Sequence, residues 1–114
     1  MQSSTCVLRA SGRRFAAKRY LATSTFIPER LEDNAFECTV SRAAADDHAL
    51  LIDDLERFLT NPRLDLARLF AFPGVERVAL VLRCSTSSDR PLVLPARVCT
   101  AMGRHGLELE VRGD

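Results

Sequence analysis

Apolar and polar residues follow two periods along this chain, and together they predict a protein of mixed strands and helices. Residues 78–82 form an uninterrupted apolar run with β-branched side chains at Val78 and Val81. The run is too short for a stable isolated helix, so it predicts a strand that is covered on both faces at the centre of a sheet. The preceding Phe72-Pro73-Gly74 predicts a chain reversal, because Pro fixes φ and Gly accepts unusual backbone angles.

Strict alternation predicts three further strands, at residues 5–10, 36–41 and 107–112. Each has one apolar and one polar face, which is typical of a sheet with one wet side. For residues 36–41, the alternation predicts inward side chains at Phe36, Cys38 and Val40, and side chains toward water at Glu37, Thr39 and Ser41. For the last strand, the residues expected to face inward are Leu107, Leu109 and Val111.

Helical spacing of apolar residues predicts helices between these strands. The main helix is expected over residues 46–59, where the carboxylates of Asp46 and Asp47 suit the unpaired N–H groups of a first turn. Its expected inner face consists of Leu50, Leu51, Leu55, Phe58 and Leu59.

Shorter helices are predicted at residues 15–24 and 64–70, and from Pro95 to a left-handed cap at Gly106. The inward residues expected of the last two helices are Leu66, Leu69 and Phe70, and Val98, Cys99 and Met102.

These elements predict one α+β domain over residues 1–114. Two strand-helix-strand units surround the long middle helix, and such units commonly assemble into a ferredoxin-like sandwich. The expected sheet has four mainly antiparallel strands, with the helices packed on one face. With 114 residues, 46% of them hydrophobic, the chain can build one compact core but hardly two.

Several stretches resemble one family. They are the first strand followed by Gly12, the segment FAAKRYLATSTFIP at residues 15–28, residues 66–76 ending in FPGVE, and the closing GLELEV. Together they are similar to the bacterial family catalogued as domain of unknown function 4279. Ser24-Thr25 and Glu32-Asp33 depart from its pattern, because such proteins usually have a Gly and a Lys-Gly pair there. The resemblance implies a small cytoplasmic α+β protein without an assigned activity.

The net charge of +1 gives no general reason to expect nucleic acid or an anionic membrane as a partner. The N-terminal residues show no cationic start followed by an apolar stretch, and no apolar run is long enough to span a membrane. A cytoplasmic protein is therefore expected. The four cysteines have no metal-ligand spacing, which predicts buried reduced thiols and neither a metal nor a cofactor.

The most suggestive ligand site is the turn before the first predicted helix. Arg13 and Arg14 follow Gly12 there, and Arg9 lies nearby on the strand. A Gly turn with exposed N–H groups and two guanidinium groups can bind a phosphate or carboxylate, which makes a small anion or metabolite-binding domain, with or without enzymatic activity, one hypothesis. The alternative is that these arginines are solvated or pair with the acidic residues of the middle segment.

No concentration of catalytic side chains supports an enzyme. A nucleophile at Cys84 or Ser85 with His105 and Asp89 is conceivable, but nothing in the spacing brings these residues together. The favoured hypothesis is a non-enzymatic module that binds another protein, with an immunity-like role as one specific version. The expected interaction strand comprises Phe36, Glu37, Cys38, Thr39, Val40 and Ser41. A homodimer through strand edges is compatible with either hypothesis.

Overall fold

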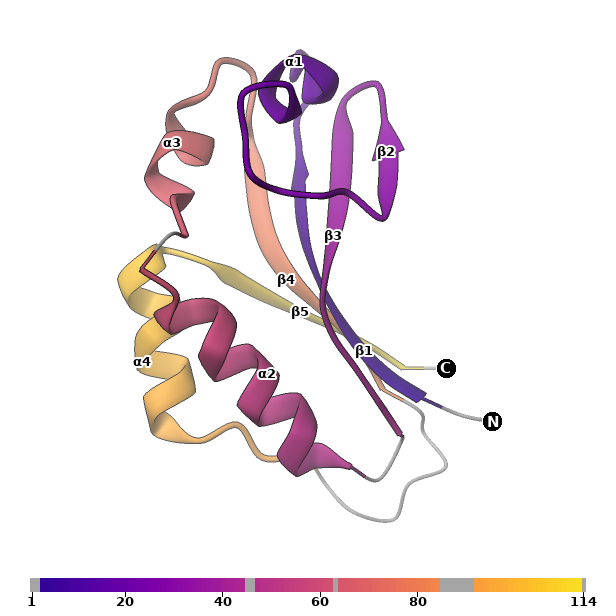
Figure 1. Ribbon diagram of the computed structural model, residues 1–114, viewed down its shortest axis with the longest axis vertical. Helices are drawn as coiled ribbons and strands as arrows, with labels where there is room; N and C mark the ends of the chain where they lie inside the picture. The colour runs from indigo at the N-terminus through magenta and orange to yellow at the C-terminus, as the bar shows by residue number, and fades with distance from the viewer. Residues whose placement is uncertain (1–2, 45–46, 63, 85–91, 114) are drawn as a thin grey trace.

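A computed structural model describes residues 3–44, 47–62, 64–84 and 92–113 of the chain. A twisted sheet carries the helices against one of its faces (Figure 1). In chain order the elements are β1 (Ser3–Ser11), α1 (Ala17–Leu21), β2 (Arg30–Glu32), β3 (Ala35–Ala44), α2 (His48–Thr60), α3 (Leu66–Ala71), β4 (Arg77–Cys84), α4 (Ala96–His105) and β5 (Glu108–Gly113).

The sheet has five strands in the order β2-β3-β1-β4-β5. All neighbours are antiparallel except β4 and β5, which are parallel because α4 crosses over between them. The α+β class is confirmed, but the expected four-stranded ferredoxin-like sheet is not matched in detail. The fifth strand is β2, which lies outside the four segments that the sequence pattern predicts to be strands. Its three residues, Arg30 to Glu32, are too few for their alternation to predict a strand, and they form one by pairing with β3.

Strand β4 confirms the prediction of a sheet strand that is covered on both faces. It pairs with β1 on one side and with β5 on the other. Residues 78–82 are all buried. Val78, Leu80 and Leu82 belong to the core beneath the helices, whereas Ala79 and Val81 alternate to the opposite face.

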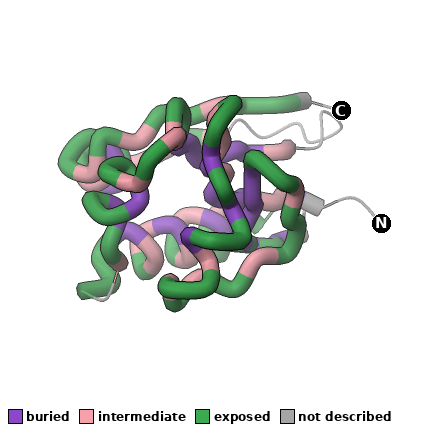
Figure 2. Tube along the Cα trace, turned by 90° about the horizontal axis from the view of Figure 1, so that it is seen from above, coloured by how far each residue is buried: buried purple, intermediate pink, exposed green. Residues whose placement is uncertain are grey.

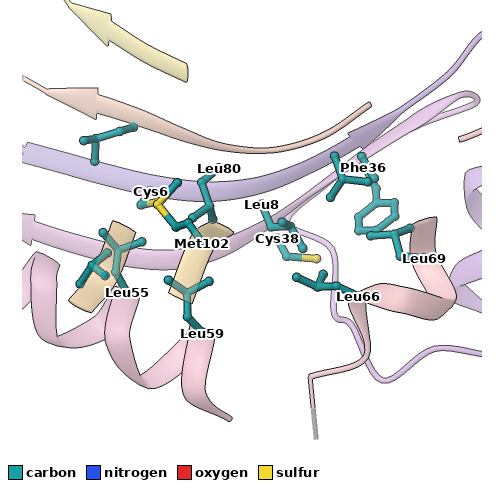
Figure 3. Packing of buried hydrophobic residues seen from close by; sticks show 14 of the residues in the cluster. Cys6, Leu8, Phe36, Cys38, Leu55, Leu59, Leu66, Leu69, Leu80 and Met102 are labelled. Carbon is teal, nitrogen blue, oxygen red and sulfur yellow. The ribbon is translucent and has the colours of Figure 1, made fainter. Parts of the chain in front are cut away.

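The core lies between the sheet and the helices, and its apolar side chains come from both layers (Figure 3). Helix α2 contributes Leu55 and Leu59 to it, and α4 contributes Met102. These side chains pack under Cys6 and Leu80 of the central strands (Figure 3). Burying such a layer is the main favourable term in folding.

At the end of the sheet near α1, a cluster of aromatic rings forms the core. The ring of Tyr20 stacks on Phe36 with 5.8 Å between centroids and meets Phe72 edge-on at 5.2 Å. Phe15 lies 6.0 Å from Phe36. These ring contacts hold Tyr20 in place. Helix α1, which carries Tyr20, covers only Ala17–Leu21 and is shorter than the expected residues 15–24.

The inner face of each helix is narrower than the apolar pattern predicts. Leu50 in the first turn of α2 is exposed, because the buried stripe follows Leu51, Leu55 and Leu59 at four-residue steps. Phe70 of α3 is 41% exposed, since Leu66 and Leu69 make the buried contact.

Helix α4 has the same narrow inner face. Cys99 is exposed, because Val98 and Met102 occupy the buried side of the helix. The expectations that Leu50, Phe70 and Cys99 face inward are therefore wrong.

The helix ends follow the capping chemistry that the sequence indicates. The carboxylate of Asp47 accepts a hydrogen bond from the N–H of Leu50 at 3.1 Å, while Asp46 lies outside the described residues. Gly106 caps α4 with a φ of 69°. Of the helices in the described part of the chain, none is long and apolar enough to cross a membrane.

Two glycine turns pack against each other, and this contact should be sensitive to a single methyl group. Gly74 has a φ of 90°, and an added Cβ would lie 2.4 Å from the carbonyl oxygen of Arg14. We therefore expect Gly74→Ala to lower the free energy of unfolding by about 2 kcal/mol. Gly103→Ala, in the open on α4, should raise it by about 0.5 to 1 kcal/mol. Urea denaturation measures both, and equal effects would contradict the packing.

Candidate functional site

The face of the sheet turned away from the helices carries most of the paired charges, and we call it the open face. The strand registers place on it Thr5, Val7 and Arg9 of β1, Glu37, Thr39 and Arg42 of β3, Arg77, Ala79, Val81 and Arg83 of β4, and Glu108, Glu110 and Arg112 of β5. The helices lie on the other side of the sheet (Figure 1). Long arginine and glutamate side chains therefore cover this face.

The centre of the open face is a buried carboxylate. The side chain of Glu37 is only 6% exposed, and Arg9 Nη1 donates to its Oε2 at 2.9 Å. Arg83 Nη2 lies 3.9 Å from the same oxygen. Charged groups are rarely buried unless they are paired, and here two guanidinium groups flank one carboxylate.

Apolar residues lie beneath these charges. Val7, Ala79 and Val81 are buried although no helix covers them. The aliphatic stems of neighbouring arginines shield such residues, while the guanidinium heads stay in water.

A second group of ion pairs lies toward β5. Arg77 Nε donates to Glu108 Oε2 at 2.7 Å, and this hydrogen bond raises the pKa of the Arg77 guanidinium. Arg112 Nη2 lies 2.9 Å from Glu110 Oε2, and Arg77 Nη1 lies 3.7 Å from Glu110 Oε1. Together with Arg30, Glu32 and Glu29 at the β2 side, six arginines face five glutamates among the described residues, so the open face as described carries no extended cationic field.

A depression of about 400 Å³ lies where the open face meets the outer edge of β3. Its lining consists of Thr5, Val7, Glu29, Arg30, Glu37, Thr39, Arg42 and Arg83. The carboxylate of Glu29 accepts a hydrogen bond from the Thr39 hydroxyl and pairs with Arg42.

The outer edge of β3 is mostly unpaired beside this depression. Strand β2 pairs only with residues 35–37, and the N–H of Glu29 donates to the carbonyl oxygen of Glu37 at 2.8 Å. Beyond Glu37, this edge has no strand partner among the described residues. The depression therefore adjoins a row of backbone groups that can accept another strand.

Only some residues of the expected interaction strand lie at the surface of the protein. Phe36 and Cys38 are buried toward the helices, as predicted. The register between β1 and β3 shifts at Cys6/Val7, so the alternation does not continue to the end of the segment.

Ser41 consequently faces the helices instead of water, and its hydroxyl donates to Asp54 Oδ2 of α2 at 2.7 Å. Val40 falls at the irregularity and is partly buried. Only Glu37 and Thr39 of the six predicted residues lie on the open face. The outward assignment of Ser41 does not hold, because a bulge changes which face a residue takes, whereas Val40 packs partly buried against the core as expected.

The arginine turn already contains a carboxylate. The N–H of Arg13 donates to Glu76 Oε1 at 2.6 Å, and the N–H of Gly12 donates to the carbonyl oxygen of Asn34. Arg13 and Arg14 are exposed, whereas Arg9 pairs with Glu37 and Glu32 on the open face. Helix α1 begins only at Ala17, so its N-terminus is not at this turn. An external anion bound by Arg9, Arg13 and Arg14 stays a prediction.

The hypothetical nucleophile site has no described geometry, because Ser85 and Asp89 lie outside the described residues. His105 has another role, in which Nε2 donates to the carbonyl oxygen of Leu59 at 2.8 Å and ties the end of α4 to α2. Cys6 and Cys38 are buried, and burial raises the pKa of the Cys38 thiol from its ordinary 9.0 to about 11. A thiol with such a pKa is a poor nucleophile at neutral pH.

In the described part of the chain, His, Cys, Asp and Glu side chains form no group of three that could hold a metal ion. Comparison with protein families, with characterised proteins and with solved structures finds no match to this chain. Inference about function therefore starts from the open face itself.

Replacing the buried carboxylate tests the ion pairs of the open face. Glu37→Gln leaves Arg9 with only the more distant Glu32, 3.6 Å away, and removes the carboxylate beside Arg83, so we expect the free energy of unfolding to fall by about 1 to 3 kcal/mol. Glu108→Gln, whose ion pair is exposed, should change it by less than about 0.5 kcal/mol. Urea denaturation of both variants measures these changes. Similar losses in the free energy of unfolding would show that the buried ion pairs of Glu37 stabilise the fold no more than the exposed pair of Glu108.

The raised pKa of Cys38 predicts a loss of stability in alkali. Between about pH 9 and about pH 11 the unfolded thiol loses its proton before the folded one, so the free energy of unfolding falls as the pH rises. Cys38→Ala should be less stable throughout but should decline less over this window. Denaturation midpoints at about pH 8 and about pH 10.5 measure the difference. Burial is the largest cause of the raised pKa of the Tyr20 phenol and acts in both proteins, whereas the minor contribution of Cys38 to it acts only in the parent. Identical declines would contradict the assignment.

Proposed function

We propose that this protein is a non-enzymatic interaction module that binds another protein at the depression between the open face and the outer edge of β3. The carrying observation is the junction itself, where a hollow lined by Thr39 and Arg42 of β3, Arg83 of β4 and their neighbours meets the edge of β3, which has no strand partner beyond Glu37 among the described residues. Strand edges commonly bind an extended segment of a partner through main-chain hydrogen bonds, and side-chain pockets provide specificity.

Glu29 indicates what kind of side chain suits this place. Its main chain runs alongside the outer edge of β3, where its N–H donates a hydrogen bond to the carbonyl oxygen of Glu37. Its carboxylate reaches Arg42 and Thr39 on the open face. A partner strand that continued beside β3 in the same way would bring its alternate side chains over Arg42 and toward the depression that Arg83 also lines. We infer that the partner segment is extended and carries acidic side chains at alternate positions.

The exposed arginines suit such recognition. The side chains of Arg30 and Arg42 are each 63% exposed, and that of Arg83 is 39% exposed. Arginine is enriched at the energetically important positions of protein interfaces, because its guanidinium group binds carboxylates in a bidentate manner and its stem packs on apolar groups.

The finer expectations from the sequence belong to the same proposal. A bacterial, cytoplasmic protein that neutralises a toxin is the specific form suggested by its size. Membership of the family of domain of unknown function 4279 and a relation to the ferredoxin-like fold are separate parts of the proposal, and neither bears on the toxin. No contact in the described residues favours the small-anion alternative, because the N–H groups of the Arg13 turn already have acceptors.

Site-specific photo-crosslinking in the native host tests the proposal. A benzoylphenylalanine at position 39, at the depression, should form an adduct with one protein, whereas the same group at position 57, on exposed α2, should not. Arg42→Glu should lower the yield of that adduct about tenfold, because it places a negative charge opposite the acidic segment.

Arg57→Glu is the matched control for this experiment, since it makes the same charge change on the helical side of the molecule. The adduct yield should be unchanged in that variant. If position 39 gave no adduct, or if positions 39 and 57 gave the same adduct, the proposed site would be wrong.

A further inference from the structure

The opposite edge of the sheet carries an unusual surface. Strand β5 is the last strand in the order, so its outer side has no strand partner among the described residues. On the helix side of this strand, Leu109 is 38% exposed and Val111 is 62% exposed. The view in Figure 2 shows the chain exposed as it approaches its C-terminal end. An edge strand with exposed apolar residues is a template for pairing with another chain.

The sequence of β5 is complementary to itself in one register. Consider two copies of β5 paired antiparallel about a two-fold axis perpendicular to the sheet. Residues directly opposite each other point to the same face, and side chains alternate between the faces along each strand. The axis must therefore lie between the two copies of one and the same residue, which is then opposite itself. An axis at Val111 places Glu110 opposite Arg112 of the second copy, twice, and Val111 opposite Val111. Charges attract at both polar positions, and the exposed apolar side chains meet on the helix side.

The other registers place like charges together. An axis at Glu110 brings the two Glu110 carboxylates opposite each other, and an axis at Arg112 does the same to the two guanidinium groups. An axis at Leu109 places Glu108 opposite Glu110 of the second copy. Like charges directly opposite each other destabilise a strand pair, whereas opposite charges and β-branched pairs stabilise it.

We propose that two copies of the chain pair antiparallel through β5, with the two-fold axis at Val111, to form a continuous ten-stranded sheet from the five strands of each copy. The occupant of this edge is therefore a second copy. The open faces of the two copies lie on the same side of the joint sheet, because the axis preserves the faces. This inference concerns the edge opposite β3 and does not depend on the proposed function.

The charges needed for the pairing are available at the surface. The side chains of Glu110 and Arg112 are 28% and 48% exposed, and they already pair within the strand at 2.9 Å. In the dimer each Glu110 carboxylate, which Arg112 and Arg77 of its own copy already flank, gains a further guanidinium neighbour from the opposite strand. The edge thus joins two ion-pair groups of the open faces into one.

Sedimentation velocity over a range of concentrations tests the dimer. We expect the mass to rise with concentration from that of the 12.7 kDa chain to twice that value. Glu110→Arg and Arg112→Glu each place like charges opposite each other, so each should weaken dimerisation about tenfold or more. The double variant restores opposite charges in this register and should recover the dimer.

Two outcomes would overturn the proposal. One is a monomer at all concentrations, and the other is a dimer that neither single charge reversal weakens. If both single variants weakened the dimer but the double variant did not restore it, the register at Val111 would be wrong. Circular dichroism of each variant establishes that it is folded.

Disulfide trapping tests the register independently of charge. In a Cys99→Ser background, Val111→Cys should form a cross-linked dimer on oxidation, because the two Cβ atoms lie directly opposite each other on the axis. Leu109→Cys is the matched control, since its opposite residue is Gly113 and its own counterpart is several residues away. Equal cross-linking of the two variants, or none above the Cys99→Ser background, would contradict the register.

Discussion

The fold depends on a sheet whose two faces are closed by different physical means. Toward the helices, the central strands bury apolar side chains such as Leu80 against α2 and α4 (Figure 3). On the open face, Val81 is equally buried, but the covering consists of arginine stems held in place by glutamates. The first covering is non-directional and strong, whereas the second depends on pairing. The open face is therefore the side of the molecule that charge changes can alter.

The strong periodic signals of the sequence predict most of the strands and helices correctly. They predict less well which face of an element a particular residue takes. Residues 78–82 form the expected strand because an apolar run leaves few alternatives to burial on both faces. Ser41 was assigned to the wrong face, because the bulge opposite Cys6/Val7 arises from pairing with β1, which no local pattern shows. Cys99 lies on the outside for a similar reason, since the neighbouring elements set how wide the buried stripe of α4 is.

The candidate site was beyond prediction from a single sequence, because its contacts join distant residues. Glu37 pairs with Arg9, 28 residues away, and Arg77 pairs with Glu108, 31 residues away. Alternation does place these residues on the polar face of their strands. It does not say which strands are neighbours, and the strand order alone determines which charges meet. The usable sequence signal is the alternation of Glu and Arg with apolar residues in β5.

The two edges of the sheet differ in how their exposed backbone is protected, and this difference follows from local residues. Next to β3, Pro28 has no N–H to donate, so the main-chain pairing beside β3 ends at Glu29. The carboxylate of Glu29 contacts Arg42 and Thr39. A charged side chain across an edge deters nonspecific pairing. Strand β5 has no comparable cover in the described residues, and its charges lie on one face while its apolar residues lie on the other. Pairing at β3 must displace an existing ion pair, whereas pairing at β5 adds to one, so the first edge favours a selective partner and the second favours self-association.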